Sequence, residues 1–314
     1  MSLSGAVAAD LGPRASPIVR DDLHASLRRR FVLGLNALAA AGTVVALVRA
    51  REHGVGAVPI GLFAVMYALT TLGVTVGYHR CFAHLSFDAR PSLRVVLAVF
   101  GSMAGQGPVI YWTANHRCHH AHTDDADDPH SPYAYGAGAW ARLRGFWHAH
   151  MGWMLEAHTA NSMVFAGDLC RDPLIVRVNR LYLVWFALGL ALPALAGGIL
   201  GRSVDAALDG LLWGGLVRYL ALFHATCAVN SLTHTFGTRR FATADRSTNL
   251  WWLALPTFGE GWHNNHHAFP RSARFGHRWF EADAGFAVVR LLRRLGLVGQ
   301  VRVAAPERGP EAPP

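Results

Sequence analysis

Four long apolar runs constrain the fold of this chain more than any other feature of its sequence. Residues 31–48 and 55–78 carry no charged side chain, and two further runs cover residues 181–200 and 208–230. About 20 apolar residues in a helix cross the ~30 Å hydrocarbon layer of a membrane. The runs therefore predict an all-α integral membrane protein with four transmembrane helices in two hairpins. The charged fraction of 16% agrees with this prediction, because soluble domains contain about 25%.

Two other apolar segments are predicted to lie along the membrane surface. Residues 93–112 contain several glycines and Pro108, which interrupt helices, so we expect a shallow helix there. Residues 249–258 are amphipathic and carry two adjacent tryptophans, a composition typical of the headgroup layer. The polar residues 116–180 must fold outside the hydrocarbon layer.

The distribution of arginine predicts the orientation of the chain. All 29 basic residues are Arg, they give a net charge of +9, and they are dense in both tails and sparse in the turns of the hairpins. Positive side chains mark the cytoplasmic side of a membrane, so we expect the termini and the histidine-rich segments in the cytoplasm, at the plasma membrane if the chain is bacterial. Anionic headgroups explain this charge better than nucleic acid does.

The same pattern predicts the domain organisation. Residues 28–300 are expected to form a single membrane domain, cytoplasmic parts included, and residues 1–27 and 301–314 to be flexible tails. Arg218 and His224 lie inside the fourth apolar run. An ionisable group is costly there and indicates a functional or paired role. The alternative is a bundle-facing pair near the membrane interface.

Histidines occur in blocks next to the apolar segments. The blocks contain His79 and His84; His116, His119 and His120; His234; and His263, His266 and His267. Residues three and four apart share a helix face, so the rings of each His-x-x-His-His block can converge. Five residues turn an α-helix by about 500°, so His79 and His84 are expected to aim their rings differently.

The number of histidines indicates two metal ions. Nine imidazoles exceed the six or fewer ligands that one ion takes, whereas a structural zinc site needs four ligands and a catalytic one three. Iron, unlike zinc, activates dioxygen. The four cysteines include no Cys-x-x-Cys pair and indicate neither a thiolate metal site nor a disulfide framework. A membrane metal-binding or transport protein is an alternative, but transport sites lie near the bilayer midplane.

The blocks and their surroundings resemble the membrane fatty-acyl desaturases of the stearoyl-CoA desaturase type. The likeness covers roughly residues 30–285 and is carried by Leu72-Gly-Val-Thr-Val-Gly-Tyr-His79-Arg80, His116-Arg-Cys-His-His120 through Asp128-Pro-His130, His150-Met-Gly-Trp-Met154, Asn230-Ser-Leu-Thr-His234 and Gly259-Glu-Gly-Trp-His-Asn-Asn-His-His267. The resemblance implies a di-iron centre in which the nine histidines are the ligands. It also implies that Asn230 approaches one iron through a water.

The resemblance further implies a path for the substrate. Gln106, Trp112 and Arg117 would line its entrance, and residues 66–70 would lie near the closed end of a kinked tunnel. Arg142 and Arg144 could bind a substrate phosphate by charge-assisted hydrogen bonds or, equally, anchor the protein at the membrane surface.

The reaction implied is the O2-dependent introduction of a cis double bond into a long-chain acyl-CoA or acyl lipid, with carbon 9 as the first position to test. Ala114 stands where the acyl-CoA enzymes have a charged residue, which leaves the carrier open. A lipid or fatty acid hydroxylase on the same scaffold is the alternative. The sequence shows no haem, flavin or iron–sulfur motif. A separate electron donor of the ferredoxin or cytochrome b5 type, with its reductase, is therefore expected.

Other polar residues flank the histidine blocks. They are His122, His130, His148 and His150, together with Asp124, Asp125, Asp127 and Asp128. We expect the four histidines to have structural roles or to orient ligand rings, and the aspartates can orient such rings through the far nitrogen. For Asp124 and Asp125, a solvated acidic loop is at least as good an interpretation.

Overall fold

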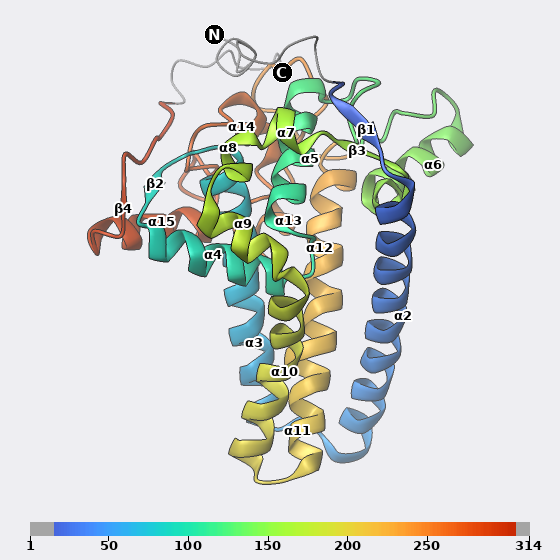
Figure 1. Ribbon diagram of the computed structural model, residues 1–314, viewed down its shortest axis with the longest axis vertical. Coiled ribbons are helices and arrows are strands. Elements are labelled where there is room, and N and C mark those ends of the chain that lie inside the picture. Colours follow the sequence, from blue (N-terminus) through green and yellow to red (C-terminus); the bar gives the residue numbers. More distant parts are fainter. Residues whose placement is uncertain (1–15, 306–314) are drawn as a thin grey trace.

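The computed structural model describes residues 16–305, which are mostly helical. Four long apolar helices are long and apolar enough to cross a membrane, as the sequence predicts, and they run side by side in Figure 1. They are α2 (Asp22–His53); α3 (Ala57–Leu72) with the π-helix η2 (Gly73–Ala83); α10 (Tyr182–Gly201); and α11 (Val204–Gly210) with the π-helix η4 (Leu211–Val217) and α12 (Arg218–Leu232).

The burial pattern of α2 explains how these helices associate. Its buried residues recur every three or four positions, from Val32 and Leu35 to Ala46, and this face packs on η4. A side chain larger than hydrogen at Gly42 would collide with Leu216. Other apolar residues of α2, such as Leu47, are exposed, as expected of a helix whose outer face contacts lipid.

The remaining elements gather at one end of the bundle (Figure 1). The helices are α4 (Pro91–Met103), α5 (Val109–His122), α6 (Ala139–His150), the 3₁₀ turn η3 (Gly152–Leu155), α7 (Ser162–Phe165), α8 (Gly167–Cys170), α9 (Pro173–Arg180), α13 (Trp251–Ala254), α14 (His263–Ala268) and α15 (Ala284–Arg294). Strand β1 (Ile18–Arg20) pairs antiparallel with β3 (His158–Ala160), and β2 (Asp88–Ala89) with β4 (Val298–Gly299). We call this end the cap, and we include in it the part of η2 that carries His79 and Arg80, because η2 packs on α4, α5 and α15.

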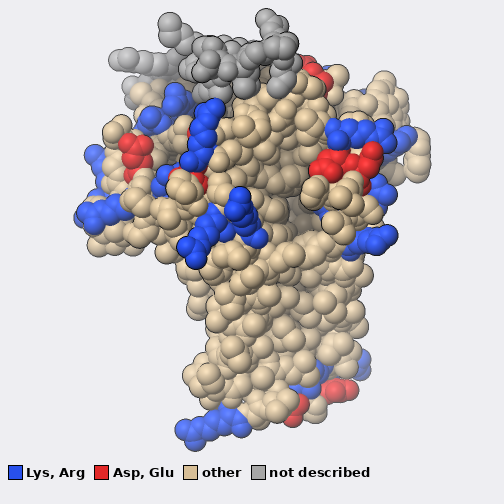
Figure 2. Space-filling view, viewed as in Figure 1, with Lys and Arg blue, Asp and Glu red and all other residues tan. Residues whose placement is uncertain are grey.

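Charged side chains are confined to the two ends of the face seen in Figure 2. Arginines, aspartates and glutamates surround the cap, and a smaller group occupies the opposite tip. The surface between them shows neither Lys or Arg nor Asp or Glu. This distribution matches a bundle whose middle contacts hydrocarbon and whose ends contact water and headgroups.

Three expected boundaries differ from the structure. Residues 93–112 do not form one helix, because α4 ends at Met103 and α5 begins at Val109 after a turn in which Gly105 and Gly107 have positive φ. Ordered structure also begins before residue 28, since β1 and the start of α2 precede it. At the other end, the backbone of residues 302–304 bonds to Ser86 and to residues 272–273. The expected tails at 1–15 and 306–314 lie outside the described residues.

The two ionisable residues of the fourth apolar helix have different partners. Arg218 is completely buried and donates to the carbonyl oxygens of Gly214, Met103 and Gly189 at 3.1, 3.0 and 2.8 Å. These carbonyls belong to three different elements, so the guanidinium braces the bundle against the cap. His224 instead stacks on His150, with 3.0 Å between ring nitrogens.

Candidate metal centre

The nine histidines of the blocks meet in two clusters inside the cap. The five-histidine cluster is His79, His84, His116, His120 and His266; the four-histidine cluster is His119, His234, His263 and His267. Within each cluster the potential donor atoms all lie within 4.8 Å of one another. Segments separated by up to 187 residues therefore converge on the five-histidine cluster.

Each of the two His-x-x-His-His blocks is divided between the clusters. On α5, His116 and His120 face the five-histidine cluster and His119 faces the other. On α14, His263 and His267 face the four-histidine cluster and His266 faces the first. In an α-helix, residue i+4 lies about 40° from residue i, whereas residue i+3 lies about 100° from residue i+4. Each helix can therefore supply ligands to two adjacent sites.

His79 and His84 aim at the same site, contrary to the expectation based on an α-helix. Their ring centroids lie 4.8 Å apart. The segment is a π-helix, and its last turn includes a bond from His84 N to His79 O. A π-helix joins residues i and i+5 by a hydrogen bond, which brings the two residues onto one side of the helix.

Carboxylates determine which ring nitrogens are free to bind a metal ion. The Nδ1 atoms of His119 and His267 lie 3.0 Å from Asp128 and Asp245, and His234 Nδ1 lies 3.3 Å from Asp124. An ionised carboxylate only accepts hydrogen bonds, so it holds the ring proton on Nδ1. The Nε2 atoms of these rings are left with a lone pair.

The Nε2 atoms within each cluster lie close enough to one another to bind a shared cation. His263 Nε2 lies 3.1 Å from the Nε2 atoms of both His234 and His267. In the five-histidine cluster, His266 Nε2 lies 3.0 Å from those of His79 and His120. A neutral imidazole has a single proton, so three converging Nε2 atoms cannot all satisfy one another by hydrogen bonds. The donor set and its geometry fit a metal ion in each cluster.

Burial keeps these rings neutral, as metal ligands must be. It lowers the pKa values of His84, His116, His119, His120, His263, His266 and His267. Burial opposes ionisation of Asp245, but hydrogen bonds from His267 and Ser247 outweigh it and hold the pKa of this carboxyl well below its usual range. The site therefore combines neutral ligands with ionised supports.

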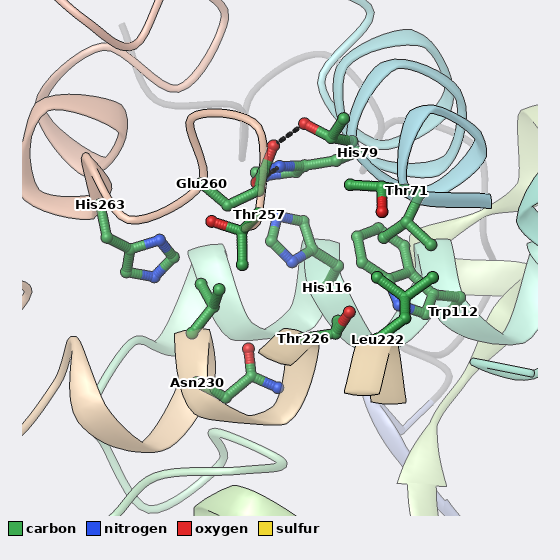
Figure 3. A pocket seen from close by; sticks show the side chains of 13 residues that line it. Thr71, His79, Trp112, His116, Leu222, Thr226, Asn230, Thr257, Glu260 and His263 are labelled. Atoms are coloured by element: carbon green, nitrogen blue, oxygen red, sulfur yellow. Dashed lines mark hydrogen bonds and ion pairs between the residues drawn. The ribbon is translucent and has the colours of Figure 1, made fainter. Parts of the chain in front are cut away.

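A cavity lies between the two clusters and the bundle (Figure 3). His79, His116 and His263 contribute to its wall. The rest of the lining comprises Thr71, Val74, Thr75, Trp112, Leu222, Thr226, Val229, Asn230, Thr257 and Glu260. Side chains from both clusters thus border one space, and Asn230 lines it as well.

Comparison with known proteins identifies the family. The fatty acid desaturase family matches residues 55–293. The chain belongs to the fatty acid desaturase family. It is an oxidoreductase, and the names of its relatives favour desaturation over hydroxylation.

The relatives act on different acyl carriers. The chain is 41% identical to the hex-5-enoyl-(acyl-carrier protein) acetylenase of Moorena producens (strain JHB) over 290 residues, which cover 92% of this chain and 90% of the relative. It is 38% identical to the sn-1 stearoyl-lipid 9-desaturase of Anabaena variabilis, with 78% and 84% covered. It is 35% identical to an acyl-CoA C20 Delta5-desaturase of Anemone leveillei, with 77% and 72% covered. The family is therefore established, but the acyl-CoA type is not.

A buried ion network supports the five-histidine cluster of this desaturase. Glu260 bonds to His79 Nδ1 and Thr75 Oγ1, and Arg80 Nη1 donates to it at 2.6 Å. Arg80 also donates to Asp283 at 3.0 Å. Glu260 and Asp245 had no predicted role. Glu260 contacts residues far away along the chain, and Asp245 lies in a loop without a distinctive sequence pattern. For Glu260, the available signal was its position between Gly259 and Gly261, just before His263.

Of the five residues expected to bind the desaturase's substrate, Trp112 lines the cavity and the other four are absent from its lining. Trp112 stacks on His116 and lines the cavity, and Gln106 is buried with its amide nitrogen unpaired. Arg117 is engaged by Asp168 and by the carbonyls of Ala83, Phe82 and Phe165. Arg142 and Arg144 lie exposed on α6. Their substrate roles stay predictions.

The flanking residues also have defined neighbours. Asp124 and Asp128 support ligand rings, whereas Asp125 and Asp127 are exposed. His130 lies against His119, with ring centroids 4.3 Å apart, and burial lowers its pKa to about 3. His122 lies next to Phe165, His148 next to Tyr135 and His150 next to His224.

Proposed function

We propose that this desaturase binds one iron ion in each histidine cluster and uses O2 to introduce a cis double bond into a long acyl chain. The observation that carries the proposal is the pair of convergent histidine clusters bordering one cavity. When bound, the iron pair supplies the oxidant: two hydrogens leave adjacent methylenes, and with two electrons and two protons from a donor they reduce O2 to two waters.

The chain's own residues perform the remaining tasks. The nine histidines hold the ions, and Asn230 meets the ion of the four-histidine cluster through a water. Trp112, Leu222, Val229 and Thr226 line the space in which the acyl methylenes lie. Because both clusters border that space, a bound chain is held against them, and positioning of this kind lowers the barrier to reaction. Burial of the site limits access of water.

An acyl lipid is the proposed substrate, with carbon 9 as the first position to test. The guanidinium of Arg117 is already engaged by one carboxylate and three carbonyls, which leaves it poorly placed to hold the phosphates of CoA. Ala114 is apolar and buried. The exposed apolar surface of the bundle suits a substrate that arrives through the membrane.

The proposal includes the setting of the protein. The four apolar helices cross the membrane as two hairpins, and the arginine-rich cap lies in the cytoplasm. A separate donor of the ferredoxin or cytochrome b5 type supplies the electrons there. The uncharged belt between the charged ends of Figure 2 supports the crossing, and the greater number of arginines at the cap supports the orientation.

Fatty acid analysis of a desaturase-deficient host tests the activity. Expression of the wild-type chain should yield a new cis monounsaturated acid by gas chromatography with mass spectrometry, and His267→Ala should abolish it. Purified protein with a donor system should then convert deuterated phospholipid in vesicles and leave deuterated acyl-CoA unchanged. Conversion of acyl-CoA alone would overturn the carrier, and a hydroxylated product would overturn the reaction.

A further inference from the structure

The two histidine clusters differ in the charge of the groups that support them. In the four-histidine cluster, three of the four rings have a carboxylate at Nδ1. In the five-histidine cluster, His79 alone has one among residues 16–305, Glu260, and that carboxylate is shared with Arg80. One site is therefore supported by several anions and the other by an ion pair.

The anions of the four-histidine cluster are not neutralised locally. The side chains of Asp128, Asp124 and Asp245 are only 0%, 8% and 13% exposed. Within residues 16–305, none of the three has a guanidinium nitrogen of an arginine within 4.0 Å. Buried charges are screened less than exposed ones, so a cation in this cluster experiences an attraction from all three carboxylates.

Positive charge lies closer to the five-histidine cluster. Arg80 occupies one oxygen of Glu260, and the neighbouring Asp283 lies on the other arm of this guanidinium. Arg117 donates to the carbonyls of Phe82 and Ala83, which directly precede His84. Asp168 pairs with Arg117 and compensates its charge. The net attraction for a metal ion is therefore weaker here.

The number of ligands acts in the opposite direction. The five-histidine cluster offers one more imidazole, but this ligand is neutral and replaces a water that would otherwise complete the coordination. The three aspartates instead contribute full charges to the attraction of a divalent cation, and charge interactions are strong where water is excluded. The difference in charge therefore outweighs the extra neutral ligand.

We propose that the four-histidine cluster is the tighter of the two metal sites and fills first, because Asp124, Asp128 and Asp245 act on its metal ion through their histidines. The proposal rests on the proposed ligand set. At limiting iron, the chain would then carry one ion in the four-histidine cluster and lack activity. Desaturation would begin only with the second equivalent.

Asp124 offers the cleanest variant for removing charge while keeping shape. Its Oδ2 accepts from Arg246 N at 2.7 Å and lies 3.4 Å from His234 Nδ1, and its Oδ1 lies 3.3 Å from the same ring nitrogen. The oxygen of an asparagine can keep both contacts of Oδ2, while an NH2 group in the place of Oδ1 removes the charge. Asp124 has a φ of 64°, a conformation that asparagine also tolerates. Asp127→Asn is the matched control, since Asp127 is exposed in the same loop.

The proposal is tested by titrating the metal-free protein in detergent with Co2+ in an isothermal titration calorimeter. The wild type should bind in two steps at least tenfold apart in affinity. His234→Ala should abolish the tight step and His84→Ala the weak step. Asp124→Asn should weaken only the tight step by about 10–100-fold, the usual cost of losing a group that supports a ligand. Asp127→Asn should change neither.

Two results would overturn this proposal and leave the proposed function intact. They are two steps of equal affinity in the wild type, and an Asp124→Asn variant that leaves the tight step unchanged or weakens the step assigned to His84. Failure of the wild type to bind Co2+ at all would overturn the ligand set as well, and with it the proposed function. The two failures are therefore distinguishable in one experiment.

Discussion

Two completely buried arginines, one in the bundle and one in the cap, perform different tasks. Arg218 in the bundle donates only to backbone carbonyls, whereas Arg80 in the cap binds the carboxylates of Glu260 and Asp283. The bundle uses its charge as a brace between helices that apolar packing already holds. The cap uses its charge to neutralise groups that orient a metal ligand. The cost of losing each arginine should differ accordingly.

The largest effect is expected from Arg80→Met. It leaves Glu260 and Asp283 buried without their cation, and breaking a buried pair in this way costs about 3–5 kcal/mol of folding free energy. Thermal unfolding of the purified protein in detergent measures the loss. If Arg80→Met were no less stable than Arg218→Met, the distinction between the two arginines would be lost.

Removal of the metal should affect the cap and spare the bundle. At free iron a hundred times its dissociation constant, binding stabilises a site by about 2.7 kcal/mol. Chelation should therefore raise amide hydrogen exchange in α14 by roughly 100-fold and leave the middle of α10 unchanged. Equal acceleration in both helices would show that the bundle and the cap do not differ in this respect.

Glu260→Gln should weaken the site that Arg80 supports. The substitution keeps the size of the side chain but removes the charge between His79 and Arg80. We expect metal binding in the five-histidine cluster to weaken by about 10–100-fold, measured by equilibrium dialysis. The four-histidine cluster serves as the internal control, because Glu260 contacts none of its rings within the described residues.

Arg218→Met should have the smallest effect. It removes three hydrogen bonds to carbonyls but also removes a buried cation that has no carboxylate partner within the described residues. The net loss should be about 1 kcal/mol, with the iron content unchanged. Loss of iron from this variant, with folding intact, would assign Arg218 to the site instead of to the bundle.

Local sequence patterns predicted the bundle and the ligand blocks. Hydropathy identified the four apolar helices, since a membrane requires long uncharged helices, and the three-and-four spacing indicated that each block converges. The same spacing did not indicate that His119 and His266 point to the opposite site from their neighbours. That division depends on how α5 and α14 pack.

The supports of the ligands required the tertiary structure. Glu260 contacts Thr75, which lies 185 positions away in the sequence. Asp245 lies in a loop without regular secondary structure. The π-helix at His79 was also unpredicted, because it depends on close packing of η2 on α4, where a side chain at Gly73 would collide with Phe100 and Gly101. Long-range pairs of this kind carry no local signal.

Iron content per chain tests the two-site assignment most directly. It should be measured by mass spectrometry on the wild type, on His120→Ala, on His267→Ala and on the double variant, each confirmed as folded by size-exclusion chromatography. We predict two iron ions in the wild type, one or fewer in each single variant, and none with no desaturated product in the double variant. Wild-type iron content in the folded double variant would contradict the assignment.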